Sequence, residues 1–299
     1  MNSLAAGDTP PEEVIVLKKR PRRAAYVLPT LFTSGSIFLG FLATLQAFQG
    51  AMQAQSGDYG YNSHLAIAAK ALGIAVFFDG LDGRIARMTN TVSDFGRELD
   101  SIADAITFGI APAVLAFVWG VFFVVSPDGT WLLSHLMRAG YVVVFFYLLC
   151  NAVRLARFNV QTNPKPKNPG RPDRKYFVGM PTPAGAGFVA AVVFMDTSPV
   201  RSFTFSIIWL IAIAIVSFLM VSTWRYPSFK QISMSQPHSP LVVLLIGIFG
   251  ILIWNWAQPV LLSLALVYVL SGIVIRVGGI IRRRVKGRTP KTVTERQVG

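Results

Sequence analysis

The sequence predicts an all-α integral membrane protein, a polytopic bundle of about eight transmembrane helices with both termini in the cytoplasm. Three observations lead to this fold class. Of the 299 residues, 53% are hydrophobic and only 14% are charged, whereas a soluble domain carries about 25% charged residues. Apolar segments of about 17 to 25 residues, the length that crosses a bilayer as a helix, recur along the chain. Lys and Arg gather in every second connection, as the positive-inside rule expects.

The first four segments follow this alternation closely. A basic run at 18–23 precedes the first apolar segment, and the polar connection after it has no Lys or Arg. The second segment ends in a connection with three arginines, and the third ends in a short connection without any. The fourth ends in a loop rich in Pro, Lys and Asn. These four predicted helices cover residues 26–48, 65–87, 95–124 and 138–158.

The last four segments continue the pattern. The fifth and sixth are separated by a connection whose only basic residue is Arg201, and Arg225 and Lys230 follow the sixth. No Lys or Arg stands between the seventh and eighth, and the eighth runs into the basic stretch 282–286. The alternation places both termini and the connections 2–3, 4–5 and 6–7 in the cytoplasm. These predicted helices cover residues 179–195, 203–223, 240–256 and 259–281.

The net charge of +14 does not indicate a nucleic-acid partner. The basic residues stand in short runs beside apolar segments, where they would face anionic membrane lipids. A single cysteine, Cys150, lies within an apolar segment and excludes an intrachain disulfide. The expected partners of the basic runs are therefore membrane lipids.

Four aspartates gather where the second and third predicted helices meet. At 100° per residue, Asp82, Gly83, Ala86 and Arg87 all lie within about 80° of Asp79 on one helical stripe. The same geometry aligns Gly96, Asp100 and Asp104 on the next helix. Because a short turn joins the two helices, the two stripes can face each other.

Such a cluster of carboxylates calls for cations. A carboxylate near mid-membrane costs about 2.5 kcal/mol or more, and four together also repel. Oxygen ligands favour Mg²⁺, Mn²⁺ or Ca²⁺, and two metals about 3.5–4 Å apart suit phosphoryl transfer. Arg87 could pair with a phosphate. The alternative explanation is that the aspartates form hydrogen bonds between helices. It could account for one aspartate, but less readily for four that share two helical stripes with an arginine.

The spacing D-x2-D-G-x2-A-R-x8-G-x3-D-x3-D, which residues 79–104 match without a gap, resembles the signature of the CDP-alcohol phosphotransferases. The resemblance implies that Asp79, Asp82, Asp100 and Asp104 bind two divalent ions, Mg²⁺ or Mn²⁺. It also implies that Asp104 is the catalytic general base on the attacking hydroxyl. The residues that would contact the CDP moiety are Gly83, Arg87, Ser93 and Thr33. Relatives commonly carry Asn where this chain has Thr30 and Ser36.

Three further segments resemble the membrane-bound phosphatidylserine synthase branch of that family. They are LPTLFTSGSIFLGF at 28–41, NAVRLARFN at 151–159 and VGMPTPAGAG at 178–187. The resemblance implies the reaction of CDP-diacylglycerol with L-serine to give phosphatidylserine and CMP. It further implies a homodimer in the inner, cytoplasmic membrane, with the active site facing the cytoplasm.

The same resemblance divides the chain into four parts. A basic cytoplasmic N-terminal segment covers 1–24, and a catalytic bundle of six helices covers 25–225. Two additional transmembrane helices cover 226–282, and a basic cytoplasmic tail covers 283–299.

Serine would need a cation for its carboxylate. Arg154 and Arg157 stand near the cytoplasmic end of the fourth helix, and an arginine can bind a carboxylate through two parallel hydrogen bonds. Asn151 could orient the acceptor or bond between helices. Positive-inside topology is the competing explanation for both arginines.

Two other functions stay open at this stage. A related enzyme could use another acceptor alcohol, such as glycerol 3-phosphate, inositol or choline. A divalent-cation transporter could use the aspartates as an ion path, although transporters more often place such groups at the midplane. A structural scaffold gives no reason for acids confined to two stripes.

Overall fold

The computed structural model describes residues 27–88, 94–125, 129–162, 176–227 and 240–286, with side chains described over a slightly narrower range. Helices account for nearly all of it. In chain order they are α1 (Val27–Gln55), α2 (Ser63–Met88), α3 (Asp94–Asp104), the π-helix η2 (Ala105–Ile110), α4 (Ala111–Gly120), α5 (Thr130–Thr162), α6 (Thr182–Met195), α7 (Phe203–Val221) and α8 (Pro240–Lys286). Two short strands, β1 (Tyr176–Val178) and β2 (Arg225–Pro227), complete the fold.

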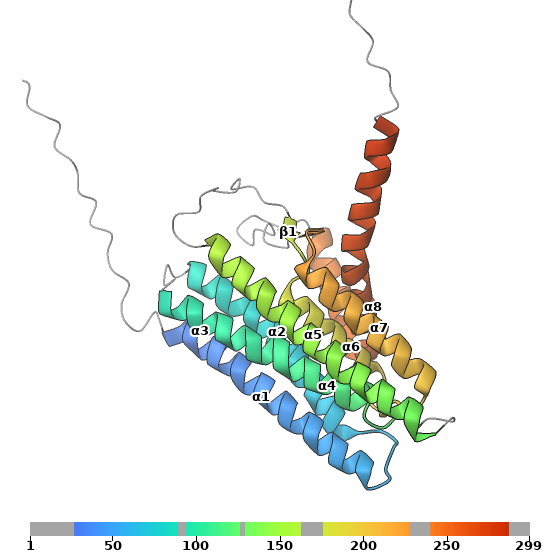
Figure 1. Ribbon diagram of the computed structural model, residues 1–299. Helices are drawn as coiled ribbons and strands as arrows, with labels where there is room; N and C mark the ends of the chain where they lie inside the picture. The colour runs from blue at the N-terminus through green and yellow to red at the C-terminus, as the bar shows by residue number, and fades with distance from the viewer. Residues whose placement is uncertain (1–26, 89–93, 126–128, 163–175, 228–239, 287–299) are drawn as a thin grey trace, which may run out of the picture.

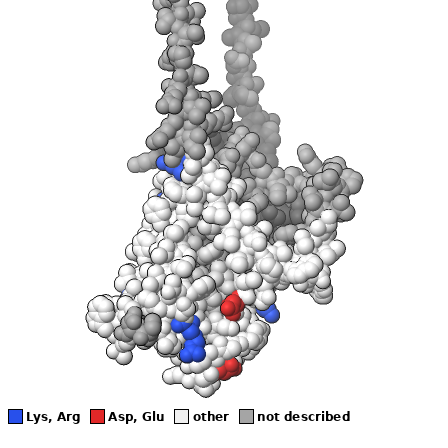
Figure 2. Space-filling view, turned by 90° about the vertical axis from the view of Figure 1, so that its right-hand side faces the viewer, with Lys and Arg blue, Asp and Glu red and all other residues white. Residues whose placement is uncertain are grey.

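The helices form an elongated bundle in which α1 to α7 run side by side, while the last turns of α8 extend beyond it (Figure 1). Six helices in the described part of the chain are long and apolar enough to cross a membrane. Large apolar side chains face outward, such as Phe38 at 62% and Phe145 at 62% exposure. Figure 2 shows a described surface with few charged side chains. The chain is a multi-pass membrane protein.

The predicted helices are found, with different boundaries. The fourth begins at Thr130 instead of Arg138, because apolar residues precede that arginine. The fifth, α6, has only 14 residues. The seventh and eighth form α8, whose backbone breaks at Trp256 (φ −136°, ψ 50°) shortly before Pro259, as a proline within a helix requires. The count of eight spans and the cytoplasmic termini stay predictions.

The third predicted helix is interrupted by η2, directly after Asp104. Single π turns within α-helices are frequent at functional sites. The Thr107 hydroxyl donates to the Ser36 carbonyl at 3.0 Å and so ties η2 to α1. Gly40 permits this close approach, because a Cβ there would lie 2.7 Å from the Thr107 Cα.

The all-α prediction agrees with the structure, to which two strands of three residues each add a short antiparallel pair. Phe177 pairs with Tyr226 in an antiparallel register. Gly179 then turns the chain into α6 with φ +79°, a conformation that suits glycine, and its N–H donates to the Trp224 carbonyl at 2.8 Å. The β1–β2 pair joins the end of α7 to the start of α6. The predicted loop at 162–176 falls mainly outside the described residues.

Two buried tryptophans pack against each other in the core. Trp119 on α4 and Trp209 on α7 meet edge to face with their ring centroids 5.1 Å apart. The Trp119 indole N–H donates to the Asp196 carbonyl at 2.7 Å. The Trp209 indole N–H donates to the Ala116 carbonyl at 3.0 Å. These hydrogen bonds tie α4 to α7 and to the residue after α6 within the core.

Gly40→Ala is expected to lower the free energy of unfolding by about 1–3 kcal/mol, because the added methyl group overpacks the α1–η2 contact. Thermal unfolding in detergent micelles measures the change. Gly250→Ala is the matched control, since a Cβ at Gly250 meets nothing within 4 Å. Equal melting temperatures for the two variants would contradict the close contact.

Candidate active site

Three of the four predicted aspartates lie together. Asp79 on α2 and Asp100 and Asp104 on α3 each offer a carboxylate oxygen, and these oxygens all lie within 4.8 Å of one another. All three side chains are partly buried. The helix α2 continues through Asp82, Gly83 and Arg87 to Met88, but these three side chains lie outside the described residues. Ser93 lies outside them entirely.

This donor set fits a divalent metal ion. The Asp79 and Asp104 carboxyls are close enough to hydrogen-bond, and the Asp100 charge also acts on Asp79. Crowded carboxylates in a partly buried place repel unless cations sit among them. Oxygen-only ligands match hard cations such as Mg²⁺, Mn²⁺ and Ca²⁺. The described chain thus contains an aspartate cluster able to hold a divalent metal ion.

Arg154 on α5 brings positive charge to this cluster. Its guanidinium interacts with the charges of Asp104 and Asp79. One terminal nitrogen approaches the Thr182 hydroxyl at 3.5 Å, at the start of α6. The Nε atom is buried and has no hydrogen-bond partner within the described part of the chain. A buried donor without a partner costs about 1–3 kcal/mol, so this edge of Arg154 is well suited to a ligand.

Asn151 and Tyr147 hold the π turn behind Asp104. The Asn151 Nδ2 and the Tyr147 hydroxyl both donate to the Phe108 carbonyl, at 2.9 Å and 3.1 Å. Because Nδ2 donates to this carbonyl, only Oδ1 of Asn151 is left to accept a hydrogen bond. Oδ1 is buried and has no hydrogen-bond partner in the described residues. Of the two roles considered for Asn151, the structure supports interhelical bonding and leaves Oδ1 available.

Arg157 and Asn159, the remaining polar residues of segment 151–159, form hydrogen bonds to neighbouring elements of the fold. Arg157 donates to the carbonyls of Val221 at 2.9 Å and Val178 at 3.1 Å, and so ties α5 to α7 and β1. The Asn159 Nδ2 donates to the Ser101 hydroxyl at 2.8 Å, which fixes α3 against α5. Arg157 therefore already binds two carbonyls. Its predicted contact with an acceptor stays untested.

Thr33 is buried on α1 at 6% exposure. The helix α1 packs against both α2 and α3, which carry the clustered aspartates. Its predicted contact with CDP stays a prediction.

Two residues near the site were not predicted as functional. The Thr182 side chain is fully buried beside Arg154. Tyr268 on α8 interacts with the Arg154 charge and packs its ring 5.7 Å from that of Tyr226. Burial raises the pKa of Tyr226 to about 12, so its hydroxyl stays protonated and donates to the Val269 carbonyl at 3.4 Å. No local sequence signal connects α8 to α5, because the contact is purely tertiary.

Comparison with known proteins shows which family has this arrangement of residues. The sequence model of the CDP-alcohol phosphatidyltransferase family matches residues 26–216, which include all three clustered aspartates and Arg154. The chain belongs to the CDP-alcohol phosphatidyltransferase family. Within the family, the chain is similar to a Helicobacter pylori protein named CDP-diacylglycerol–serine O-phosphatidyltransferase. The two are 33% identical over 229 residues, which cover 76% of this chain and 83% of the relative.

Two other members of the CDP-alcohol phosphatidyltransferase family carry the same name. The Bacillus subtilis relative is 32% identical over 205 residues, covering 68% of this chain and 92% of its own. The Saccharomyces cerevisiae relative is 38% identical over 121 residues, covering 40% of this chain and 39% of its own. Proteins named CDP-diacylglycerol–serine O-phosphatidyltransferase from both bacteria and yeast are thus similar to this chain.

Proposed function

We propose that this family member transfers the phosphatidyl group of CDP-diacylglycerol to L-serine and releases CMP. The observation that carries the proposal is the buried Nε of Arg154 beside Asp104, which has no hydrogen-bond partner among the described residues. A serine bound there would present its carboxylate to a cation and its hydroxyl to a general base. The names of the relatives in Helicobacter, Bacillus and yeast support the same acceptor.

In the proposed reaction, Asp104 accepts the proton of the serine hydroxyl. The serine Oγ attacks the β-phosphorus of CDP-diacylglycerol and forms the new P–O bond. The bond from that phosphorus to the bridging oxygen breaks, and CMP leaves with this oxygen. Divalent ions held by Asp79, Asp82, Asp100 and Asp104, two Mg²⁺ or Mn²⁺, would offset the charge of the pyrophosphate and of the leaving CMP.

The proposed serine pocket uses two buried atoms of α5 that have no hydrogen-bond partner in the described part of the chain. The carboxylate would bind along the Nε edge of Arg154, in the paired geometry that arginine offers. The ammonium group would donate to the Asn151 Oδ1, which stands three residues earlier on the same helix. Gly109 leaves room beside this oxygen, because a Cβ there would lie 3.2 Å from it. Gly83, Arg87, Ser93 and Thr33 are proposed to bind the CDP moiety.

The orientation of the chain is also proposed. The basic runs support an active site facing the cytoplasm, in a catalytic bundle of residues 25–225 followed by helices within 226–282. The flanking segments 1–24 and 283–299 would then lie on the cytoplasmic side. A homodimer is part of the proposal as well.

An acceptor panel tests the function. Purified protein with CDP-diacylglycerol and Mg²⁺ or Mn²⁺ should release CMP when serine is added, and not with glycerol 3-phosphate, inositol or choline. CMP release with one of these alcohols and none with serine would assign another member of the family. Metal flux into liposomes without CMP release would support the transporter.

Arg154→Leu is expected to raise the KM for serine about 10- to 100-fold, because one charge-assisted contact contributes about 1.5–3 kcal/mol. Arg154→Lys keeps the charge, loses the Nε donor and should recover only part of this loss. Arg201→Leu is the control, since Arg201 is exposed and stacks on Tyr59 with its guanidinium 4.2 Å from the ring centre. An unchanged KM for serine in Arg154→Leu would remove this residue from the acceptor site.

A further inference from the structure

The π turn η2 lies inside one continuous apolar helix that is made of α3, η2 and α4. At the end of η2 the Ala111 N–H donates to the carbonyl of Ile106, five residues earlier. A turn closed by such a bond holds one residue more than an α-turn. Because each residue of an α-helix turns the chain by about 100°, η2 changes the direction of the α3 side chains relative to α4 by about that angle.

Pro112 gives a local reason for the wide turn. In a regular α-helix the Phe108 carbonyl would accept a hydrogen bond from the residue four positions later, which is Pro112 and has no N–H. The proline ring would also clash with that carbonyl. A wider turn relieves the clash, and the Phe108 carbonyl then needs a donor from elsewhere in the fold.

Two side chains of α5 supply the donors. The Tyr147 hydroxyl donates to the Phe108 carbonyl at 3.1 Å, and the Asn151 Nδ2 donates to it at 2.9 Å. Tyr147 is 1% exposed and Asn151 is fully buried. A buried carbonyl without a donor is unfavourable, so both side chains stabilise η2. They stand four residues apart and therefore on the same face of α5.

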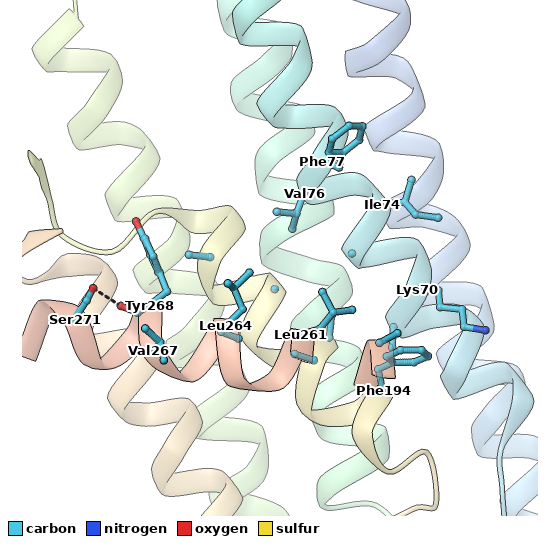
Figure 3. A pocket seen from close by; sticks show the side chains of 18 of the residues that line it. Lys70, Ile74, Val76, Phe77, Phe194, Leu261, Leu264, Val267, Tyr268 and Ser271 are labelled. Carbon is cyan, nitrogen blue, oxygen red and sulfur yellow. Dashed lines mark hydrogen bonds between the residues drawn. The ribbon is translucent and has the colours of Figure 1, made fainter. Parts of the chain in front are cut away.

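The side chain of Phe108 is fixed as well. It is fully buried and packs with Ala75 of α2 and Ala186 of α6, and Val76 lies against this small cluster. Figure 3 shows Val76 on the side of α2 that faces α6, and a Cβ at Gly187 would lie 4.0 Å from it. The carbonyl and the ring of Phe108 thus hold η2 against α2, α5 and α6.

The change of direction at η2 acts on the aspartates. On one side of η2, α4 is fixed by the Trp119 indole N–H, which donates to the Asp196 carbonyl at 2.7 Å. On the other side, the Asp100 and Asp104 carboxylates of α3 meet that of Asp79. If η2 became an α-turn while α4 kept its place, α3 would turn by about 100° and carry both carboxylates away from Asp79.

We propose that Tyr147 is a positioning residue, whose bond to the Phe108 carbonyl keeps η2 wide and so directs Asp104 toward the metal ions and the acceptor hydroxyl. The inference rests on the proposed function for the roles of Asp104. Pro112 disfavours the α-turn, and Tyr147 stabilises the wide turn that replaces it. The same carbonyl matters to the acceptor, because Asn151 shares it through Nδ2 and keeps Oδ1 available.

Tyr147→Phe tests this role by removing one hydroxyl group. The variant should bind Mn²⁺ with a dissociation constant about tenfold higher, the effect of one lost hydrogen bond. At saturating Mn²⁺ its kcat for CMP release should also be about tenfold lower, with an unchanged KM for CDP-diacylglycerol. Electron paramagnetic resonance of free Mn²⁺ measures the binding without any substrate. Tyr141→Phe is the matched control and should behave as wild type, because Tyr141 stands on the same helix and is 55% exposed.

A second substitution separates positioning from stability. Pro112→Ala supplies the missing N–H and removes the ring, so the Phe108 carbonyl gains a backbone donor in an α-turn. In the double variant Tyr147→Phe/Pro112→Ala the melting temperature should therefore recover toward that of wild type. The Mn²⁺ affinity and kcat should instead fall by more than the product of the two single losses, because neither the proline nor the tyrosine then disfavours the α-turn.

Recovery of the Mn²⁺ affinity together with the melting temperature would overturn the proposal, since Tyr147 would then serve stability alone. Equal Mn²⁺ affinities in Tyr147→Phe and Tyr141→Phe would overturn it as well. If wild-type protein releases no CMP with serine, the proposed function fails, and the Mn²⁺ affinities still decide whether Tyr147 positions Asp104.

Discussion

Asp104→Asn is expected to reduce kcat for CMP release at least about 10²- to 10⁴-fold, the contribution typical of a general base. The amide cannot accept the proton of the serine hydroxyl. It also removes one oxygen ligand from the cluster that Asp104 shares with Asp79 and Asp100. Single-turnover rates of CMP release, measured at saturating metal and serine, give the loss directly.

Asp58→Asn is the matched control for this experiment. Asp58 follows the end of α1 opposite the site, where it accepts a hydrogen bond from the Gln53 side chain at 2.9 Å. That bond lowers the pKa of the exposed Asp58 carboxyl, so this aspartate is charged at neutral pH but far from the chemistry. Turnover by Asp104→Asn equal to that of Asp58→Asn would show that the assigned base is wrong.

Removal of divalent ions with a chelator is expected to abolish CMP release, and Mg²⁺ or Mn²⁺ should restore it. Without cations the clustered carboxylates repel one another, so bound metal should also raise the melting temperature of the protein. Thermal unfolding with increasing Mn²⁺ measures this effect in the absence of any substrate. The rise should be largest at Mn²⁺ concentrations far above the dissociation constant.

Asp79→Asn separates metal binding from general stability. This variant relieves repulsion and should melt no lower than wild type without metal, yet it should lose most of the response to Mn²⁺. Turnover that survives complete chelation, or an equal Mn²⁺ response in wild type and Asp79→Asn, would contradict the metal assignment.

The transmembrane helices could be predicted because their signal is local. A run of apolar residues such as 203–223 needs no partner to be recognised, and α7 occupies Phe203–Val221. The π turn after Asp104 could not be predicted, because the Phe108 carbonyl is satisfied by Tyr147 and Asn151 from another helix. The strand pair likewise depends on two segments far apart in the chain.

The aspartate cluster was predictable for a related reason. Helical phase aligns Asp100 with Asp104, and the short connection to α2 brings Asp79 opposite them. The roles within segment 151–159 were not separable by sequence, since Arg154 and Arg157 looked alike. The structure distinguishes them, because Arg157 binds two backbone carbonyls whereas Arg154 keeps a buried Nε without a partner in the described residues. The contact of α8 with α6 was not predictable either, because no local pattern encodes it.

The most direct test of phosphatidyl transfer to serine uses serine labelled with ¹⁸O in its hydroxyl group. Purified protein with CDP-diacylglycerol and Mg²⁺ or Mn²⁺ should form phosphatidylserine and CMP in equal amounts, with the label only in phosphatidylserine, as mass spectrometry can show. Attack at the other phosphorus would instead give phosphatidic acid and a labelled cytidylyl-serine. That outcome, or CMP formed without phosphatidylserine, would contradict the proposed reaction.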